Sequence, residues 1–343
     1  MKSERSFTEA GILMSSELTI GTYRYEHTEA LFDGRVKIDG VDATLETEPL
    51  VSDLFRHMLE GRYGIAELGL TYFLRTFDLE DAPFMALPIF PNRNFRHSAI
   101  FVNTEAGIEK PQDLAGRTLG EFALFGHDAG VWPKGILSDE YGVTVDQCHW
   151  VIGGTDHPIP AFDWLPQPVP DGVHVRHADD GRTLGAMLES GEVDALISVD
   201  VPQAMLRGST KIARLFPDYE NVERDYYRRT GIFPPMHIVA VRKDLVHRCE
   251  DLRSVYRAFV KAKDLAERTY LEDAAKQHMS LVTPWFSSLF EHNRSLLGED
   301  WWPYGLRANR KAVDTFLRYH HEQGLSKRLL TSRDIFIPEF IDT

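Results

Sequence analysis

Short apolar strand patterns alternate with amphipathic helix patterns from residue 18 onward, and this alternation constrains the fold more than any other feature of the chain. Residues 18–23 (LTIGTY) predict a first strand, and residues 42–49 and 65–68 predict two more. Residues 52–61 lie between them and predict a helix that starts at a serine and ends at a glycine. Such alternation favours an α/β fold with a largely parallel sheet.

A second α/β unit starts near residue 110, and the chain then returns to the first. Residues 149–152 and 194–199 predict strands of this second unit, and residues 234–241 predict a return strand. Helices are predicted beyond it at 252–270, 272–281, 285–297 and 308–323. This order predicts two lobes between which the chain crosses twice. The predicted division is an N-terminal extension (1–17), lobe 1 (18–101 and 218–343) and lobe 2 (102–217).

Length and charge exclude several classes of protein. A chain of 343 residues suits two lobes of ordinary size, and a net charge of −14 disfavours binding to nucleic acid or an anionic membrane. The N-terminus shows neither the apolar core nor the cleavage site of a secretory signal, which predicts a cytoplasmic protein. Two cysteines are too few for a disulfide framework or a cysteine-based metal site.

Several phrases in the sequence resemble a known superfamily. KPQDLAG, GEVDALISV and FPPMHIVAVRKDL resemble recurring phrases of type II periplasmic binding proteins, which place one lobe at the two chain ends and the other in the middle. Four longer stretches resemble the 4,5-dihydroxyphthalate decarboxylase group within that superfamily. They are residues 90–103, 126–142, 214–237 and 300–330.

The resemblance implies a two-lobed α/β fold with mixed sheets flanked by helices, and an aromatic-acid decarboxylase of phthalate degradation. Its substrate would be a small aromatic dicarboxylate, from which one carboxylate is lost to give a dihydroxybenzoate. No organic cofactor is expected, whereas a divalent metal and a homo-oligomer both stay open. The alternative function is a non-catalytic solute-binding protein for a small aromatic or carboxylate ligand.

Decarboxylation of an electron-rich ring needs a proton donor for the ring carbon and cationic or N–H donors for the carboxylates. His127 and Asp128 precede a predicted helix and form the preferred acid and its orienting carboxylate, with Trp132 as a wall for the ring. Asp128 is alternatively a simple helix cap. Because Pro133 fits only a first helical turn, the helix is expected to start near Val131.

Other polar residues are candidates because they stand at strand ends or in stiff loops. Arg96, His97 and Ser98 are interpreted either as a carboxylate clamp with a polar tip or as an exposed strand edge. His157 and Asp163 lie in a proline-stiffened loop, and His237 starts the return strand; both histidines are alternative acids. Trp301 and Trp302 are interpreted as packing residues. The remaining substrate-binding candidates are Tyr23, Glu67, Thr71, Asp200 and Arg229.

Overall fold

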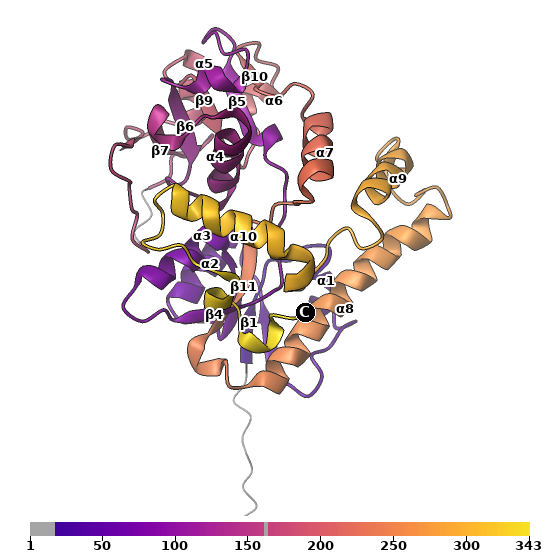
Figure 1. The fold of residues 1–343 in the computed structure, drawn as a ribbon. Coiled ribbons are helices and arrows are strands. Elements are labelled where there is room, and N and C mark those ends of the chain that lie inside the picture. The colour runs from indigo at the N-terminus through magenta and orange to yellow at the C-terminus, as the bar shows by residue number, and fades with distance from the viewer. Residues whose placement is uncertain (1–17, 161–163) are drawn as a thin grey trace, which may run out of the picture.

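The computed structural model describes residues 18–160 and 164–343, so the predicted extension 1–17 and the candidate Asp163 lie outside the described residues. Two lobes are stacked one above the other, each built around its own sheet (Figure 1). The α/β fold with two lobes and mixed, helix-flanked sheets is therefore confirmed.

The lower sheet contains strands from both ends of the described chain. Its order is β2-β1-β3-β11-β4, in which β1 runs parallel to β2 and β3, whereas β11 runs antiparallel to β3 and β4. In β11, His237 pairs with Gly69 of β3. The bounds are β1 Leu18–Gly21, β2 Ala43–Glu46, β3 Ile65–Gly69, β4 Phe84–Leu87 and β11 His237–Arg242.

The upper sheet is formed by the middle of the chain, in the order β10-β5-β9-β6-β7-β8. Strand β5 runs antiparallel to β9 and β10, and the pairs β6–β9, β6–β7 and β7–β8 are parallel. The bounds are β5 Ile100–Asn103, β6 Thr118–Phe122, β7 His149–Gly153, β8 His174–His177, β9 Ala195–Ile197 and β10 Ile212–Arg214.

The predicted lobe boundaries need correction at both crossings. The boundary at 101/102 would divide β5, which pairs with β9 and β10 and so belongs wholly to the upper lobe. At the return crossing, α7 (Tyr219–Thr230) was assigned to lobe 1, yet Glu223 of α7 accepts the backbone N–H of Ser98, and Tyr226 packs on His97. The chain therefore returns after α7, through residues 231–236, and not at residue 218.

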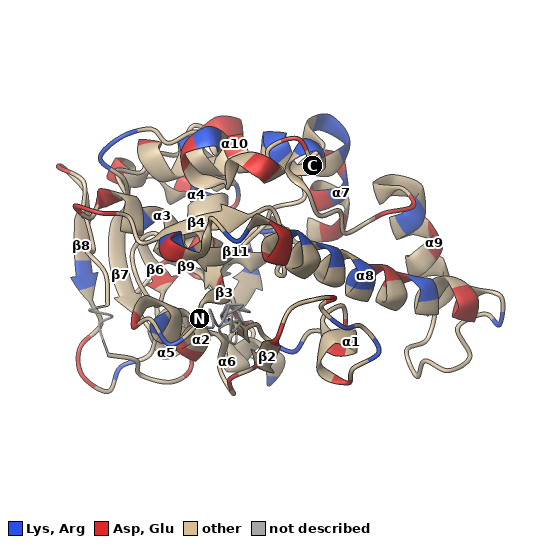
Figure 2. Cartoon of the chain, turned by 90° about the horizontal axis from the view of Figure 1, so that it is seen from below, with Lys and Arg blue, Asp and Glu red and all other residues tan. Residues whose placement is uncertain are grey.

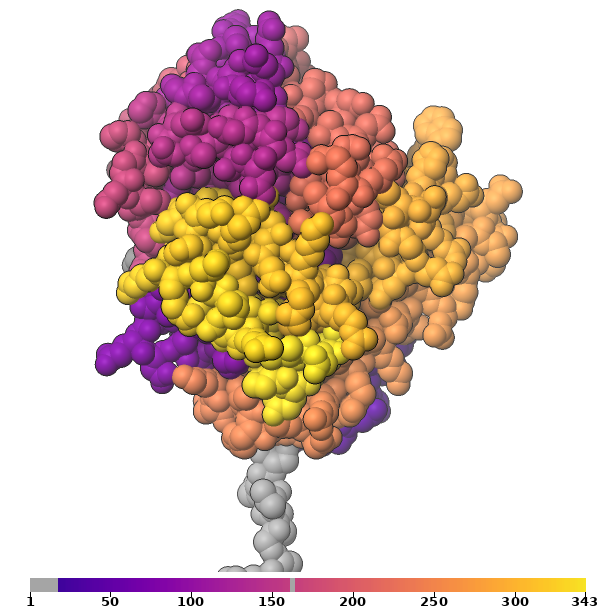
Figure 3. Space-filling model, in the orientation of Figure 1, coloured from indigo at the N-terminus to yellow at the C-terminus, as the bar shows by residue number. Residues whose placement is uncertain are grey.

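Most helices lie against one sheet or the other. In the lower lobe, α2 packs on β3 and α1 packs on α8, and in the upper lobe α5 packs on β6 and β9. Helices α8 and α9 form an arm that projects from the lower lobe (Figures 1 and 3). The bounds are α1 Glu29–Phe32, α2 Val51–Leu59, α3 Leu70–Arg75, α4 Asp128–Tyr141, α5 Leu184–Ser190, α6 Gln203–Leu206, α8 Cys249–Ala274, α9 Phe286–Leu297, α10 Leu306–Glu322 and α11 Ser332–Ile335.

The predicted helix at 272–281 is wrong beyond Ala274, where α8 ends. Gln277 and His278 have φ values of 56° and 52°, a left-handed conformation that interrupts a right-handed helix. The chain turns back in this region before α9 begins. Charge alternates in sign along α8, as Figure 2 shows, which is typical of a helix with a solvent-exposed face.

Helix α10 connects the two lobes along one side of the molecule. In Figure 3 the C-terminal segment that contains it lies across the junction between them. The ring of Trp132 in α4 packs 5.6 Å from Phe316 and 5.7 Å from Tyr319, both on α10. Gly135 permits this approach, because a Cβ there would lie 2.1 Å from the Tyr319 ring. The upper-lobe helix α4 is thus fixed by a C-terminal helix as well as by the two crossings.

Candidate active site

The candidate site lies where the ends of the two sheets meet. Parallel strands present functional groups at their carboxyl ends, and here β1 and β3 of the lower sheet end beside the start of β11. The loop after β6 of the upper sheet leads into α4 at the same junction, because Asp128 of α4 accepts the backbone N–H of Thr71 in α3. Segments that are distant in the sequence therefore supply the site.

Glu67 and His237 form its buried centre. The Nδ1 atom of His237 lies 2.6 Å from Oε1 of Glu67, which is fully buried. The Tyr25 hydroxyl donates to the same oxygen at 2.6 Å. Oε2 accepts the Tyr23 backbone N–H at 2.9 Å and the Thr22 hydroxyl at 3.2 Å. This carboxylate is surrounded by donors on both oxygens.

These donors decide the charge of Glu67. Burial alone would raise its pKa, but the hydrogen bond and charge of His237, together with the Tyr25 and Tyr23 donors, hold the pKa below its ordinary value. An ionised carboxylate on Nδ1 fixes the proton of His237 on that nitrogen. The Nε2 atom then has no hydrogen-bond partner among the residues that the structure describes, and His237 retains a small exposed fraction of its side chain, 8%.

Arg96 supplies positive charge to the same junction. Its side chain is buried, and its Nε donates to the sulfur of Met236 at 3.3 Å. Its two terminal nitrogens have no hydrogen-bond partner within residues 18–160 and 164–343. Burial lowers the pKa of Arg96 to about 10, so the guanidinium stays charged at neutral pH. An arginine in this state can bind a carboxylate with both terminal nitrogens.

His127 sits at the start of α4, but its geometry differs from that of an acid. Its Nδ1 accepts the backbone N–H of Ala129 at 3.2 Å, so His127 is the N-cap of the helix. Burial, together with the charges of Arg96 and His237, lowers its pKa to about 3. His127 is therefore neutral at pH 7. The helix starts at Asp128, three residues before the predicted Val131, because the imidazole provides the cap.

Asp128 joins the two lobes. One carboxylate oxygen accepts the backbone N–H of Thr71 at the start of α3, whereas Oδ2 is buried with no partner in the described part of the chain. Gly69 makes room for it, because a Cβ there would lie 2.3 Å from Oδ2. Burial raises the pKa of Asp128 to about 6, against the opposing effects of His237 and the Thr71 N–H.

Arg75 was missed by the sequence analysis. It lies on α3 and its guanidinium crosses to the upper lobe, where it donates to the carbonyl oxygen of Phe125 at 2.7 Å and to Oε1 of Gln167 at 2.6 Å. Phe125 belongs to the loop that carries His127, so Arg75 fixes the position of this loop. A lone arginine in the apolar segment LTYFLR was the available signal.

Comparison with known proteins identifies the family. The chain is 33% identical over 330 residues to a 4,5-dihydroxyphthalate decarboxylase of Comamonas testosteroni, with 95% of this chain and 98% of the relative covered. The chain belongs to the 4,5-dihydroxyphthalate decarboxylase family. A relative of the same name from Pseudomonas putida is 32% identical over 219 residues, which cover 63% of this chain and 83% of the relative. No model in a scan of protein families matches.

Comparison with solved structures supports the fold assignment for this member of the family. The aliphatic sulphonate binding protein SsuA of Escherichia coli superposes with a TM-score of 0.51 at 14% identity, covering 93% of this chain and 91% of SsuA. DSZB in complex with biphenyl-2-sulfinic acid gives 0.51 at 16% identity, covering 95% and 97%. The similarity to type II periplasmic binding proteins is thus confirmed at the level of the fold. The enzyme class predicted from the resemblance, a decarboxylating lyase, is confirmed by the family.

Two predicted site residues of this family member take structural roles instead. Trp132 is fully buried, donates its indole N–H to the carbonyl of Pro235 at 2.8 Å, and packs against α10, so it has no free face for a substrate ring. Arg229 lies on the surface of α7 and pairs with Glu140 at 2.8 Å and Asp225 at 2.6 Å. These two carboxylates compensate the charge of Arg229, which lies away from the junction of the lobes.

The segment that follows Arg96 turns away from Glu67. His97 is buried between Phe216 and Tyr226, with ring centroids 5.3 Å from each. Ser98 donates its backbone N–H to Glu223 on α7 at 2.8 Å. Of the predicted triplet, the structure brings Arg96 to the candidate site and places the other two in the packing beneath α7.

The loop candidates His157 and Asp200 are exposed. The backbone N–H of Asp200 donates to the Ser198 hydroxyl at 3.1 Å, which places Asp200 just after β9 at the junction edge of the upper sheet. Burial and the neighbouring Asp156 raise its pKa. Neither residue contacts Glu67 or His237, so their roles stay predictions.

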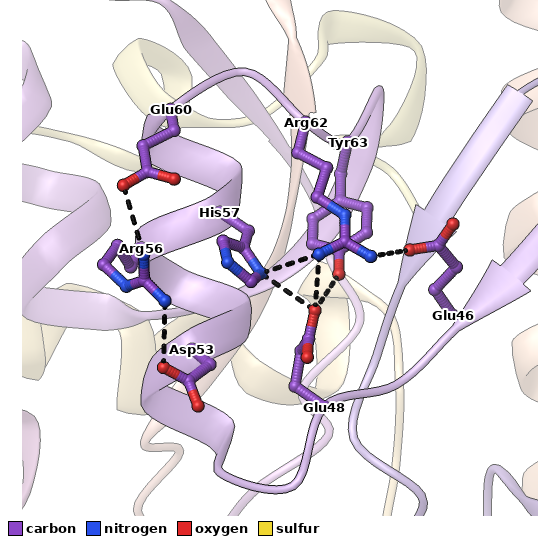
Figure 4. Close-up of polar contacts among 8 residues, drawn as sticks. All are labelled: Glu46, Glu48, Asp53, Arg56, His57, Glu60, Arg62 and Tyr63. Carbon is purple, nitrogen blue, oxygen red and sulfur yellow. Dashed lines mark hydrogen bonds and ion pairs between the residues drawn. The ribbon is translucent and has the colours of Figure 1, made fainter.

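A second histidine–glutamate pair lies elsewhere in the lower lobe and provides a contrast. Figure 4 shows His57 on α2 directed toward Glu48. Nδ1 of His57 lies 2.8 Å from Oε1 of Glu48, which also accepts Arg62 at 3.0 Å and the Tyr63 hydroxyl at 2.8 Å. Arg62 continues the network to Glu46 at 2.7 Å. This network fastens α2 to the chain after β2, and it makes a matched control for the buried pair.

Two further findings bear on the predictions. Within the described residues, no three His, Cys, Asp or Glu side chains are grouped closely enough to hold one metal ion. No helix in the part of the chain that the structure describes is long and apolar enough to cross a membrane.

Proposed function

We propose that this chain decarboxylates 4,5-dihydroxyphthalate to protocatechuate by protonating the ring carbon that loses its carboxylate. The observation that carries the proposal is the buried Glu67–His237 pair, in which Nε2 of His237 has no partner among the described residues. Arg96, whose two terminal nitrogens are likewise unpartnered there, contacts Met236, the residue that precedes His237. A proton donor and a carboxylate clamp thus meet at one junction. The names of the two relatives support the choice of substrate.

Arg96 binds one of the two carboxylates in this mechanism. A guanidinium with both terminal nitrogens available matches the two oxygens of a carboxylate, and its burial strengthens the attraction. The substrate therefore enters with one carboxylate held by Arg96 and the other directed toward the proton donor.

His237 is the proposed proton donor. The negative charge of Glu67, 2.6 Å from Nδ1, stabilises the imidazolium, which carries a second proton on Nε2. The hydroxyl para to the departing carboxylate pushes electron density to the ring carbon, which takes the Nε2 proton. The bond between that carbon and the carboxylate then breaks, its electron pair restores the aromatic ring, and CO2 leaves. His237 recovers its proton from solvent.

This assignment revises the ranking of the acids. His127 was preferred from sequence, but as a neutral helix cap it is not an imidazolium acid at pH 7, and Asp128 holds the two lobes together through Thr71. We further propose that no organic cofactor takes part. A divalent metal would have to be bound by fewer than three of the described His, Cys, Asp and Glu side chains together with substrate.

The test is turnover of 4,5-dihydroxyphthalate by the purified chain, followed as CO2 release. We expect turnover by the wild type, a loss of at least 100-fold in kcat for His237→Gln, and an unchanged rate for His57→Gln, which removes the half-buried histidine of the control pair. Tight binding of the substrate without CO2 release would favour the alternative, a solute-binding protein. A fully active His237→Gln variant would refute the assigned proton donor but not the reaction.

A further inference from the structure

A second cavity lies outside the junction of the lobes, between the α8–α9 arm and the lower lobe. Its volume is about 290 Å³. An apolar cavity of about 150 Å³ is enough to hold benzene, so this one has room for two fused rings. Six aromatic side chains line it: Phe233, Tyr270, Phe286, Phe290, Trp301 and Trp302. Trp301 and Trp302, interpreted from sequence as packing residues, thus border an open space.

Two buried polar atoms on this wall have no hydrogen-bond partner in the described structure. They are Oε1 of Glu267 on α8 and Nε2 of His27. Leaving a buried polar atom unpaired costs about 1–3 kcal/mol, so such atoms call for an explanation. A ligand with a hydroxyl group would satisfy Glu267.

The charges around the cavity restrict the ligand. Lys263, the cation nearest Glu267, is already saturated by carboxylates, with Asp300 at 2.7 Å, Asp264 at 3.0 Å and Oε2 of Glu267 at 3.2 Å. Arg294, the other cation on the wall, pairs with Glu299 at 3.5 Å, so an anionic ligand would meet this acidic group with both cations already paired. A buried ammonium ion has three N–H donors, whereas Oε1 of Glu267 and Nε2 of His27 are the buried wall atoms that lack a partner among the described residues.

We propose that this cavity is a binding site for a neutral, flat aromatic compound of up to two rings that carries a hydroxyl group. The rings stack on the aromatic wall, and the hydroxyl donates to Oε1 of Glu267. The site is separate from the proposed active site. The rings of Tyr25 and His27 stand between the two, stacked with centroids 5.2 Å apart, and Tyr25 turns its hydroxyl toward Glu67.

The test uses 2-naphthol as the probe, with binding measured by calorimetry on the full chain. We expect one bound 2-naphthol per chain, and naphthalene, which lacks the hydroxyl, to bind at least fivefold more weakly. Ala266 lies on the wall, so Ala266→Leu should abolish binding by filling the space. At pH 8, above the pKa of Glu267, which burial raises to about 7, Glu267→Gln should weaken binding about five- to tenfold, because a neutral acceptor replaces a charged one.

Two controls separate this site from the active site and from misfolding. His237→Gln and Arg96→Met should bind 2-naphthol as the wild type does, and Ala266→Leu should keep the wild-type melting temperature and rate of CO2 release. If binding is lost in His237→Gln, the probe occupies the active site and the proposal is wrong.

Three other results would also overturn it. These are no binding of 2-naphthol at millimolar concentration, tighter binding of the naphthylmethylammonium cation than of 2-naphthol, and affinity that falls as the chain self-associates at higher concentration. The last result would mean that a second copy of the chain covers the cavity.

Discussion

Replacing Glu67 by glutamine tests how the buried carboxylate controls His237. Each oxygen of Glu67 accepts two donors: Thr22 and Tyr23 on one side, Tyr25 and His237 on the other. An amide of the same shape has one oxygen and one NH2 group. In either orientation of the amide, its NH2 group faces one of the two pairs of donors, where Glu67 offers an acceptor.

The better fit directs the amide oxygen toward the Tyr23 N–H, which cannot rotate, and the NH2 group toward His237. Nδ1 must then lose its proton to accept a hydrogen bond, so His237 becomes neutral and no longer acts as an imidazolium acid. A general acid contributes about 10²- to 10⁴-fold to rate, and we expect kcat to fall within that range. The KM should change less than threefold, because Arg96 still binds the carboxylate.

The assay is steady-state CO2 release by Glu67→Gln, with Glu48→Gln as the matched control. Glu48 also accepts a histidine, but in the network of Figure 4 away from the lobe junction, so its variant should retain the wild-type kcat. Circular dichroism should show both variants folded. A folded Glu67→Gln protein with kcat within threefold of the wild type would refute this account of the acid.

Three more predictions follow from the same site. Arg96→Met should raise KM about 10- to 150-fold, which corresponds to the loss of a charged hydrogen bond of about 1.5–3 kcal/mol. An unchanged KM in steady-state kinetics would exclude carboxylate binding by Arg96. Asp128, with a pKa raised to about 6, binds its proton more tightly in the folded than in the unfolded chain. Its contribution to stability should therefore fall by about 2 kcal/mol as pH rises from 4 to 7. Urea unfolding of Asp128→Asn should show this pH dependence reduced, and an equal slope in both proteins would contradict the assignment. Dialysis against EDTA should change CO2 release less than twofold, and a loss restored by one divalent metal would show that a metal is required.

Much of the fold can be predicted from sequence because its strands are strongly apolar. Strand β8 (HVRH) and the short β10 have no such pattern, and pairing with the neighbouring strand decides them. The start of α4 was misplaced because Pro133 outweighed the capping histidine, yet the structure accommodates the proline inside the helix.

The site was predictable as a set of residues but not as a set of contacts. Glu67 and His237 were both candidates, yet only the antiparallel pairing of β3 with β11, which sets His237 opposite Gly69, places them together. The sequence analysis selected Tyr23, whereas the hydroxyl that reaches Glu67 is that of Tyr25. Periodicity in a loop gives no direction to a side chain, so these partners follow from tertiary structure alone.

The attachment of α10 to α4 determines the side from which a substrate can enter. Trp132, Phe316 and Tyr319 form a tightly packed seam, and separating it would expose large aromatic surfaces to water at a cost of several kcal/mol. Any opening of the lobes would therefore pivot most easily about this seam, which holds them together in addition to the two chain crossings. Such a pivot would open the opposite edge of the molecule, and a substrate that binds as proposed would reach Arg96 and His237 from there. Helix α10 thus determines the side from which a substrate would enter, although it contributes no proposed catalytic group.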